Sequence, residues 1–413
     1  MILSAAPGQS SSPSRPFAWR FTVFRPRVSR DMRPCSLTPP SFIALLALAL
    51  LAVPQDAGAL QPALKSHEAN PDRSVTFRLY APTAASVTVG VDYDRAIPMA
   101  KGGDGVWTYT TPPLLPALHM YNFTSDGTAV LDPLNPAVDP CLRLLTNEVT
   151  VPGPAQMWDV ADVPHGVVHR HMYRTAVIQG LEGDAEKYYV YTPPGYDPKS
   201  PKKYPVLYLL HGWTHVAESW MQCGQADHIL DNLDARGRIV PMIVVMPLNY
   251  GDMDFVTGAD QWDDPSKVEH NLATFSTAFL TEIIPQVEAR YNASPRRADR
   301  AIAGLSMGGG QSLVIGLRHP DVFGWVGGFS AAVVYKDLDA ELPNMSPRTA
   351  PELLWVSCAT GDGLFPAAKG FVAWLKAKGM SPMDVETDGV HNWAVWRDNL
   401  VHFAPLLFRP PAT

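Results

Sequence analysis

The chain has 413 residues, 46% of them hydrophobic and 18% charged, with a net charge of −7 and an isoelectric point near 5.9. This composition is that of a globular protein with a large apolar core, and the length suits two domains. Because no block of Lys and Arg occurs in this acidic chain, we exclude nucleic acid as a partner.

The N-terminal segment has the pattern of a secretory signal. Residues 1–41 are rich in Ser, Pro and Arg, and they precede the apolar run Phe42–Val53. That run is too short to span a bilayer, which needs about 20 residues, and small residues at 57–59 suit a signal peptidase. We expect residues 1–59 to be removed, with Met32 as an alternative start and an uncleaved anchor as the alternative reading of the run. Cleavage after Ala59 leaves 27 basic and 38 acidic residues, a net charge of −11, on a secreted or periplasmic protein with no membrane attachment.

The cysteines and histidines do not indicate a metal centre. Of four cysteines, one lies in the signal segment, and the other three, Cys141, Cys223 and Cys358, lack metal-ligand spacing and form no disulfide scaffold, although one bridge after export stays open. Three histidines occur between His165 and His171, but no Cys or carboxylate cluster accompanies them. We therefore expect strand residues there, and neither a metal nor a cofactor in the protein.

Residues 60–151 have the pattern of a small all-β domain. Four segments alternate apolar and polar side chains and are rich in Val, Thr and Tyr: SVTFRLYAP, SVTVGVDY, GVWTYTTPPL and ALHMYNFTSDG. The pair Asp126-Gly127 favours a hairpin turn. Short strands at this spacing predict an immunoglobulin-like β-sandwich.

The stretch PALHMYNFTSDGTAVLDPLNP resembles the immunoglobulin-like module that precedes some bacterial esterases and is related to family-48 carbohydrate-binding modules. Such a module implies carbohydrate binding. The aromatic side chains of Trp107, Tyr109 and Tyr121 could stack on sugars, but packing in the core is the interpretation we favour.

Residues 152–174 read as a linker and lead-in segment, because VPGPAQ and DVPHG mark irregular backbone. From residue 175 to 409 the pattern is α/β. Buried strands such as YPVLYLLHGW, IVPMIVVMPL, RAIAGLS and LLWVSCA alternate with helical segments such as ADHILDNLDARG. A further helix is expected over residues 275–291, kinked or divided by Pro285. This alternation predicts a mainly parallel sheet.

The segment AIAGLSMGG carries the strongest chemical signal in the sequence. Gly304-x-Ser306-x-Gly308 follows an apolar strand and precedes a helical stretch. A serine at such a strand-to-helix turn is exposed at the end of the sheet beside the positive end of the helix dipole, and the glycines make room for it. We therefore predict that Ser306 is a nucleophile.

A serine needs a base, and the base needs an acid that fixes its tautomer. In α/β-hydrolases the chain order is Ser, Asp or Glu, then His, which Asp362 after LLWVSCA and His391 in GVHNWAVWRDNL satisfy. Other acids in range are Asp384, Glu386 and Asp388, and other histidines are His319 and His402; their positions fit less well. Ser330 lacks a glycine frame, so we expect a structural role for it.

The oxyanion hole requires backbone N–H groups. Met307, directly after the nucleophile, should supply one, and Trp213 after the bend at His211-Gly212 should supply the other. His211 precedes the serine in the chain and would then be structural.

Four motifs, YPVLYLLHGW, IVPMIVVMPLNYG, RAIAGLSMGGGQSL and GVHNWAVWRDNL, resemble the esterase D-like, family 1 carbohydrate esterases in the same order. The group includes feruloyl, acetyl xylan and enterochelin-type esterases and mycolyltransferase relatives, and the resemblance covers residues 165–409. It implies an α/β-hydrolase fold in which the nucleophile, acid, base and two oxyanion donors fall on Ser306, Asp362, His391, Trp213 and Met307. The loop SCATGDG is smaller than the usual acid-bearing loop.

With the preceding module, the chain most resembles exported bacterial feruloyl esterases. The resemblance implies a secreted serine esterase that releases ferulate from arabinoxylan or small aromatic esters through an acyl-enzyme, without a cofactor. Trp213 and Trp393 are the aromatic residues we expect beside the substrate. Alternatives are an acetyl xylan, other carbohydrate or siderophore esterase, a related acyltransferase, and an inactive carbohydrate-binding protein; the complete Ser, Asp and His set disfavours the last.

Overall fold

The computed structural model describes residues 64–92, 96–143, 146–258, 261–334 and 337–409, which belong to one compact unit. The expected signal segment and its cleavage point lie outside the described residues. None of the helices within the described ranges is both long and apolar enough to cross a membrane.

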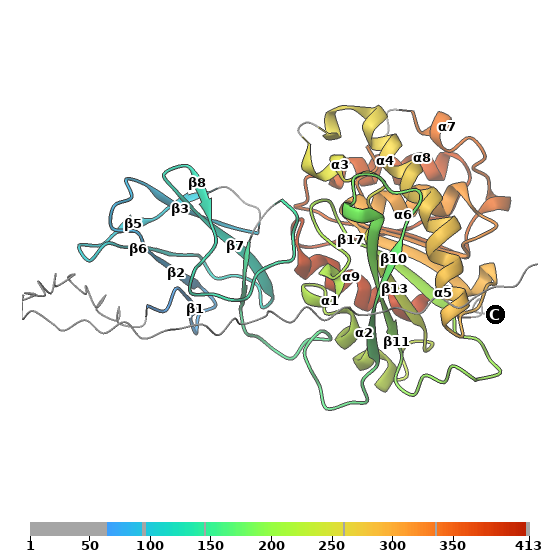
Figure 1. Ribbon diagram of the computed structural model, residues 1–413, viewed down its shortest axis with the longest axis horizontal. Helices are drawn as coiled ribbons and strands as arrows, with labels where there is room; N and C mark the ends of the chain where they lie inside the picture. Colours follow the sequence, from blue (N-terminus) through green and yellow to red (C-terminus); the bar gives the residue numbers. More distant parts are fainter. Residues whose placement is uncertain (1–63, 93–95, 144–145, 259–260, 335–336, 410–413) are drawn as a thin grey trace, which may run out of the picture. The chain divides into compact units, whose positions relative to one another are not determined.

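Two antiparallel sheets form the N-terminal domain, as the alternating pattern predicted (Figure 1). One sheet has the order β1-β2-β6-β5, and the other has the order β4-β3-β7-β8 with β9 also paired to β7. Their bounds are β1 His67–Ala69, β2 Val75–Tyr80, β3 Val87–Val91, β4 Ile97–Pro98, β5 Ala100–Lys101, β6 Val106–Thr110, β7 Leu118–Ser125, β8 Thr128–Val130 and β9 Asn147–Thr150. Asp126 and Gly127 have φ of 47° and 81°, as the tight hairpin between β7 and β8 requires.

For three aromatic residues the sequence allowed either packing in the core or stacking on a sugar, and two of them lie in the sandwich core. Trp107 and Tyr121 are 7% and 1% exposed and pack with Phe77 and Phe123 between the sheets. Core packing, the favoured interpretation, is therefore correct for both. Tyr109 is half-buried and packs at the edge of the same core.

An eight-stranded sheet forms the centre of the C-terminal domain, with the order β10-β11-β13-β12-β14-β15-β16-β17. Strands β10 and β11 are antiparallel and the others run parallel, which confirms the predicted α/β class. The bounds are β10 Val167–Arg174, β11 Ala185–Thr192, β12 Val206–Leu210, β13 Ile243–Pro247, β14 Arg300–Leu305, β15 Trp325–Phe329, β16 Leu353–Ala359 and β17 Met383–Thr387.

Helices cover both faces of this sheet (Figure 1). Successive side chains of a strand point to opposite faces, so Ala301 and Ala303 of β14 pack with α2 and α9, whereas Ile302 packs with α4, α5, α6 and α8. The helices are α1 Ser219–Gln222, α2 Ala226–Ala235, α3 Asp254–Thr257, α4 Pro265–Ala278, α5 Ile284–Arg290, α6 Ser306–Arg318, α7 Leu338–Glu341, α8 Phe365–Ala377 and α9 Trp393–Phe403.

The helix expected over residues 275–291 begins earlier and is divided. Asp264 caps α4, because its carboxylate accepts a hydrogen bond from the Ser266 N–H at 2.9 Å, so the helix already starts at Pro265. A π-helical turn, Phe279–Ile283, follows α4 and precedes α5, which holds Pro285 in its first turn. Pro285 has no N–H for the helical ladder, and the irregular turn lies where that bond is missing.

The sandwich packs directly on the hydrolase domain through β7. Leu118 and Met120 of this strand belong to the same buried cluster as Trp220, Trp393 and Trp396. The module therefore shares a buried core with α9 on one face of the sheet. Its strands can for this reason reach the loops at the carboxyl ends of the parallel strands.

Candidate active site

Ser306 lies at the turn between β14 and α6. Its φ is 52°, a left-handed conformation that costs a non-glycine residue free energy and is typical of strained functional turns. The glycines on either side are required by the backbone: a Cβ on Gly304 would lie 2.7 Å from the carbonyl carbon of Gly308, and one on Gly308 would lie 2.4 Å from the His211 oxygen. The turn therefore holds the serine tightly against the neighbouring β12 loop.

The structure brings Ser306, His391 and Asp362 together in a hydrogen-bonded chain. Ser306 Oγ lies 3.0 Å from His391 Nε2, and His391 Nδ1 lies 2.7 Å from Asp362 Oδ2. The three residues follow β14, β17 and β16, at the carboxyl ends of parallel strands, where sites form in open α/β sheets.

The acid is held in its charged form. Burial would raise the pKa of Asp362, which is 4% exposed, but the hydrogen bond and charge of His391 and the N–H of Leu364 outweigh burial and lower that pKa below its usual value. An ionised Asp362 accepts the Nδ1–H of His391, which leaves Nε2 free to accept the proton of Ser306.

The other acids and histidines considered from the sequence lie elsewhere. Asp384 and Glu386 both bind the Lys369 ammonium, at 2.6 and 2.7 Å, and Asp388 is exposed. His319 ends α6, and His402 is exposed and hydrogen-bonded within α9. Ser330 is fully buried.

Both expected oxyanion donors lie close to the nucleophile. Met307 is in the first turn of α6, where N–H groups have no intrahelical acceptor. Trp213 follows Gly212, whose hypothetical Cβ would lie 3.3 Å from the Cβ of Ser306. The loop after β12 therefore passes directly over the serine.

His211 is a buried structural residue. Its Nδ1 donates to the Gly212 oxygen at 2.8 Å, and its Nε2 accepts the Asn249 N–H at 3.2 Å. Burial lowers the pKa of His211 to about 3, so the ring is neutral at working pH.

Sequence reasoning missed two residues that support the site, Asn249 and Gln311. The Asn249 amide donates to the His211 oxygen at 2.9 Å and to Gln311 Oε1 at 2.6 Å, and Gln311 Nε2 donates back to the Asn249 oxygen at 2.9 Å. This buried network ties the Trp213 loop to α6. Both residues lie inside the motifs MPLNYG and GGGQSL, where a polar residue among apolar neighbours was the available signal.

A pocket of about 150 Å³ opens beside the nucleophile. Its lining consists of Gly212, Trp213, Thr214, His215, Leu305, Ser306, His391 and Trp396. Trp393, which we expected near the substrate, is 1% exposed and packs behind Trp396 with ring centroids 5.2 Å apart. Trp396 instead forms the pocket wall, and its ring meets that of His391 edge-on at 4.9 Å. Both indoles are 1% exposed, so their burial does not distinguish them; the difference is that Trp396 borders the pocket and Trp393 does not.

A larger pocket, about 640 Å³, lies on another side of His391. The hydrolase loops supply Gly361, Gly363, Val390 and His391, and the sandwich supplies Val91, Asp92, Ile97, Tyr109, Thr111, Pro112 and Leu114. The half-buried Tyr109 therefore contributes to a surface beside His391, which its position in the sequence did not indicate.

One group of possible metal ligands occurs in the part of the chain that the structure describes: Asp139, Glu148 and Cys223, at the contact between the two domains. The Cys223 thiol donates to Asp139 Oδ1 at 3.0 Å and to Glu148 Oε1 at 3.3 Å, and burial with these carboxylates raises the pKa of the thiol well above its usual value. The hydrogen-bonded thiol suits a structural contact. The three clustered histidines have different hydrogen-bond partners: His165 pairs with Asp231, His169 with Thr192 and His171 with Tyr291.

Comparison with known proteins agrees with the fold and with an esterase. Residues 181–362 match the family described as "Putative esterase", and residues 65–141 match carbohydrate-binding module 48, the isoamylase N-terminal domain. An endo-1,4-beta-xylanase/feruloyl esterase of Xylanibacter ruminicola is 31% identical over 356 residues, 84% of this chain. The chain spans about half of that relative, 47% of its length.

Among solved structures, the ferulic acid esterase of the fungus Anaeromyces mucronatus is 25% identical, with a TM-score of 0.53 over 60% of this chain and 93% of that one. The enterochelin esterase of Shigella flexneri aligns over 83% of this chain and 95% of its own, with a TM-score of 0.62 and 19% identity, which shows a shared fold. The α/β domain therefore matches an esterase family model over residues 181–362, and the sandwich in front of it matches carbohydrate-binding module 48 over residues 65–141.

Proposed function

We propose that the protein is a secreted serine esterase that releases ferulate and related hydroxycinnamates from plant arabinoxylan. The observation that carries the proposal is the chain of hydrogen bonds from Ser306 through His391 to Asp362, with distances of 3.0 and 2.7 Å. This geometry activates a hydroxyl for attack on a carbonyl carbon.

The reaction proceeds in two acyl transfers. Ser306 Oγ attacks the ester carbonyl while His391 Nε2 takes its proton, and the N–H groups of Trp213 and Met307 donate to the oxyanion. His391 then gives the proton to the departing sugar oxygen, which breaks the ester bond and leaves the acyl group on Ser306. A water molecule, deprotonated by His391, attacks this acyl-enzyme and releases the free acid.

The two pockets suit the two parts of such an ester. The pocket beside Ser306 has Trp213 and Trp396 in its wall, so a planar aromatic acyl group can pack between apolar surfaces there. The larger pocket on another side of His391 offers room for the sugar chain, and seven of its eleven lining residues come from the carbohydrate-binding module. The ferulate-directed names of the relatives support this choice over acetate.

The test compares ferulate release from methyl ferulate and feruloylated arabinoxylan with acetate release from acetylated xylan. We expect ferulate release by the full chain, and a loss of at least about 10³-fold in Ser306→Ala. A serine-directed phosphonate should label the protein, should not label Ser306→Ala, and should still label Ser330→Ala, the buried serine that serves as control. Acetate release without ferulate release would overturn the substrate, and labelling of Ser306→Ala would overturn the nucleophile.

Export is part of the same proposal, because arabinoxylan lies outside the cell. The apolar run Phe42–Val53 and the small residues before Leu60 support cleavage after Ala59. N-terminal sequencing of protein recovered outside the cytoplasm of an expressing bacterium should begin at Leu60; a mature protein that retains the run would contradict cleavage.

A further inference from the structure

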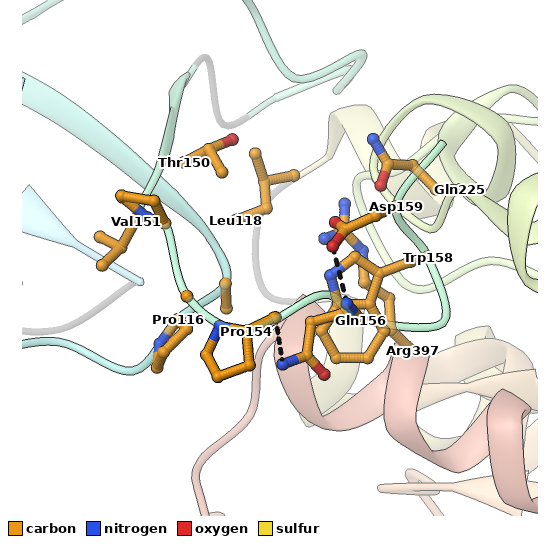
Figure 2. A pocket seen from close by; sticks show the side chains of 13 residues that line it. Pro116, Leu118, Thr150, Val151, Pro154, Gln156, Trp158, Asp159, Gln225 and Arg397 are labelled. Carbon is orange, nitrogen blue, oxygen red and sulfur yellow. Dashed lines mark hydrogen bonds between the residues drawn. The ribbon is translucent and has the colours of Figure 1, made fainter. Parts of the chain in front are cut away.

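A third pocket, away from Ser306, lies where the sandwich, the linker and the hydrolase domain meet. Its volume is about 280 Å³, just below the range of pockets that hold drug-sized ligands. Figure 2 shows Pro116, Leu118, Thr150 and Val151 of the sandwich along one side, and polar groups with one indole ring on the opposite side. That opposite side consists of Gln156, Trp158, Asp159, Gln225 and Arg397.

Arg397 is the unusual group in this pocket. It is 2% exposed, yet the hydrogen bond that the structure gives its guanidinium is a single one, from Nε to the Cys223 oxygen at 2.7 Å. Nη2 is buried and has no hydrogen-bond partner among the described residues. A buried guanidinium with an unsatisfied N–H costs free energy, and burial lowers its pKa to about 10. Because Arg397 lines the pocket, a ligand oxygen bound there is a candidate acceptor for this guanidinium.

The neighbours of Arg397 determine which ligand fits. The Arg397 guanidinium lies over the Trp158 ring, 5.6 Å from its centroid, so the indole is held in place and gives the pocket an apolar surface. The Asp159 carboxylate lines the same pocket, and its charge acts on Arg397. A ligand carboxylate or phosphate would be repelled by Asp159, whereas a hydroxyl can accept from Arg397 and donate to Asp159 at once.

We propose that this pocket binds one neutral glycosyl residue of a carbohydrate chain. Vicinal hydroxyls would bridge Arg397 and Asp159, the Gln225 amide would take a further hydroxyl, and the apolar C–H face of the sugar ring would lie against Trp158. The pocket uses the linker and α9 together with the module, so it exists only in the intact chain. The inference is independent of the ester chemistry, because the probe it needs carries no ester.

The experiment is a calorimetric titration of the full chain with xylotriose, with maltotriose and glucuronic acid as comparison ligands. We expect saturable binding of a neutral sugar, weaker binding of glucuronic acid, and at least about tenfold weaker binding of the neutral sugar by Trp158→Ala and Asp159→Asn. Trp374→Ala is the matched control, because Trp374 is also half-buried beneath a cation, Lys378 at 5.6 Å, but lies on α8 outside the pocket. Melting temperature and hydrolysis of methyl ferulate are measured on each variant.

Three results would overturn the inference. The first is an absence of saturable binding by either neutral sugar. The second is binding that Tyr109→Ala abolishes while Trp158→Ala and Asp159→Asn retain it, which would place the sugar in the pocket beside His391. The third is tighter binding of glucuronic acid than of xylotriose. Asp159 lies on the exposed rim, so Asp159→Asn remains informative if Trp158→Ala fails to fold. Failure of methyl ferulate hydrolysis would refute the proposed feruloyl substrate and leave this inference standing.

Discussion

Replacing Asp362 by asparagine tests whether this residue is the acid of the proposed triad. The loop after β17, which carries His391, is held by Asn392 and α9, so it should keep its position when Asp362 is replaced. The oxygen of the new side-chain amide can still accept the Leu364 N–H, so the fold should stay intact. What changes is the partner of His391 Nδ1, because an amide can present an N–H where the carboxylate offered only an acceptor.

The expected effect follows from that bond. The 2.7 Å contact between His391 Nδ1 and Asp362 Oδ2 is charge-assisted, and the lowered pKa of Asp362 means that the carboxylate is ionised at neutral pH. An amide in its place favours the other imidazole tautomer, with the proton on Nε2 facing Ser306, and it cannot stabilise the imidazolium. In the serine proteases this exchange lowers kcat about 10⁴-fold, and we expect a fall of about 10³ to 10⁴, or roughly 4 to 5 kcal/mol, here.

The assay is kcat and KM for methyl ferulate at pH 7, with Asp384→Asn as the matched control. Asp384 is the alternative acid that the sequence offers, but it lies on β17 and its carboxylate binds Lys369 of α8 at 2.6 Å. The Asp384→Asn variant should therefore retain kcat within about twofold. KM should change little in either variant. A kcat for Asp362→Asn within tenfold of the parent, or a large fall in Asp384→Asn, would refute the assignment of the acid.

Other parts of the chain give further predictions. Burial raises the pKa of Glu186 to about 7, so the folded state holds its proton more tightly than the unfolded state and stability falls between about pH 4.5 and 7. Glu186→Gln should remove that fall and add at most about 3 kcal/mol to the urea unfolding free energy at pH 8 but nothing at pH 4; an equal gain at both would contradict it. Gly308→Ala should prevent soluble expression, because its Cβ would meet the His211 oxygen, whereas Gly370→Ala in α8, with open space around it, should stabilise by about 0.5 to 1 kcal/mol. Tyr109→Ala should lower kcat/KM for feruloylated arabinoxylan several-fold and leave methyl ferulate unchanged; equal losses on both substrates would argue against a polymer contact.

The sequence indicates the nucleophile turn because all of its determinants are local. A buried strand, a serine framed by glycines and a helix follow one another within β14 and α6, and the structure shows why the glycines are needed, since backbone lies within 3 Å of their hypothetical Cβ atoms. The β/α alternation and the hairpin at Asp126-Gly127 likewise depend on residues that are close together in the sequence. Propensity and periodicity therefore sufficed for the fold class and for the order of strands along the chain.

Features that depend on how elements pack could not be derived in this way. Trp393 and Trp396 are two tryptophans in one short motif and both are 1% exposed, so only the packing of α9 against the sheet determines that Trp396 borders the pocket and Trp393 does not. The early start of α4 depends on a cap, Asp264, that lies before the apolar period begins. Arg397 is a charged residue of α9, yet it is 2% exposed, donates to the Cys223 oxygen and lies over the Trp158 ring, contacts that no local pattern indicates.

One contact between residues far apart in the sequence also connects the module to the candidate active site. Asn392, next to His391, caps α9 through the Val395 N–H at 3.3 Å and donates to Asp92 of the sandwich at 3.2 Å. Asp92 is itself held by His119 at 2.6 Å and by the Met120 N–H at 3.1 Å, and Met120 lies in the shared core. The loop that carries the base is thus anchored on both domains, across 300 residues of sequence. A module joined in this way does more than add an independent binding domain to a complete esterase, because its removal would take away one support of the loop that carries His391 together with seven of the eleven lining residues of the larger pocket.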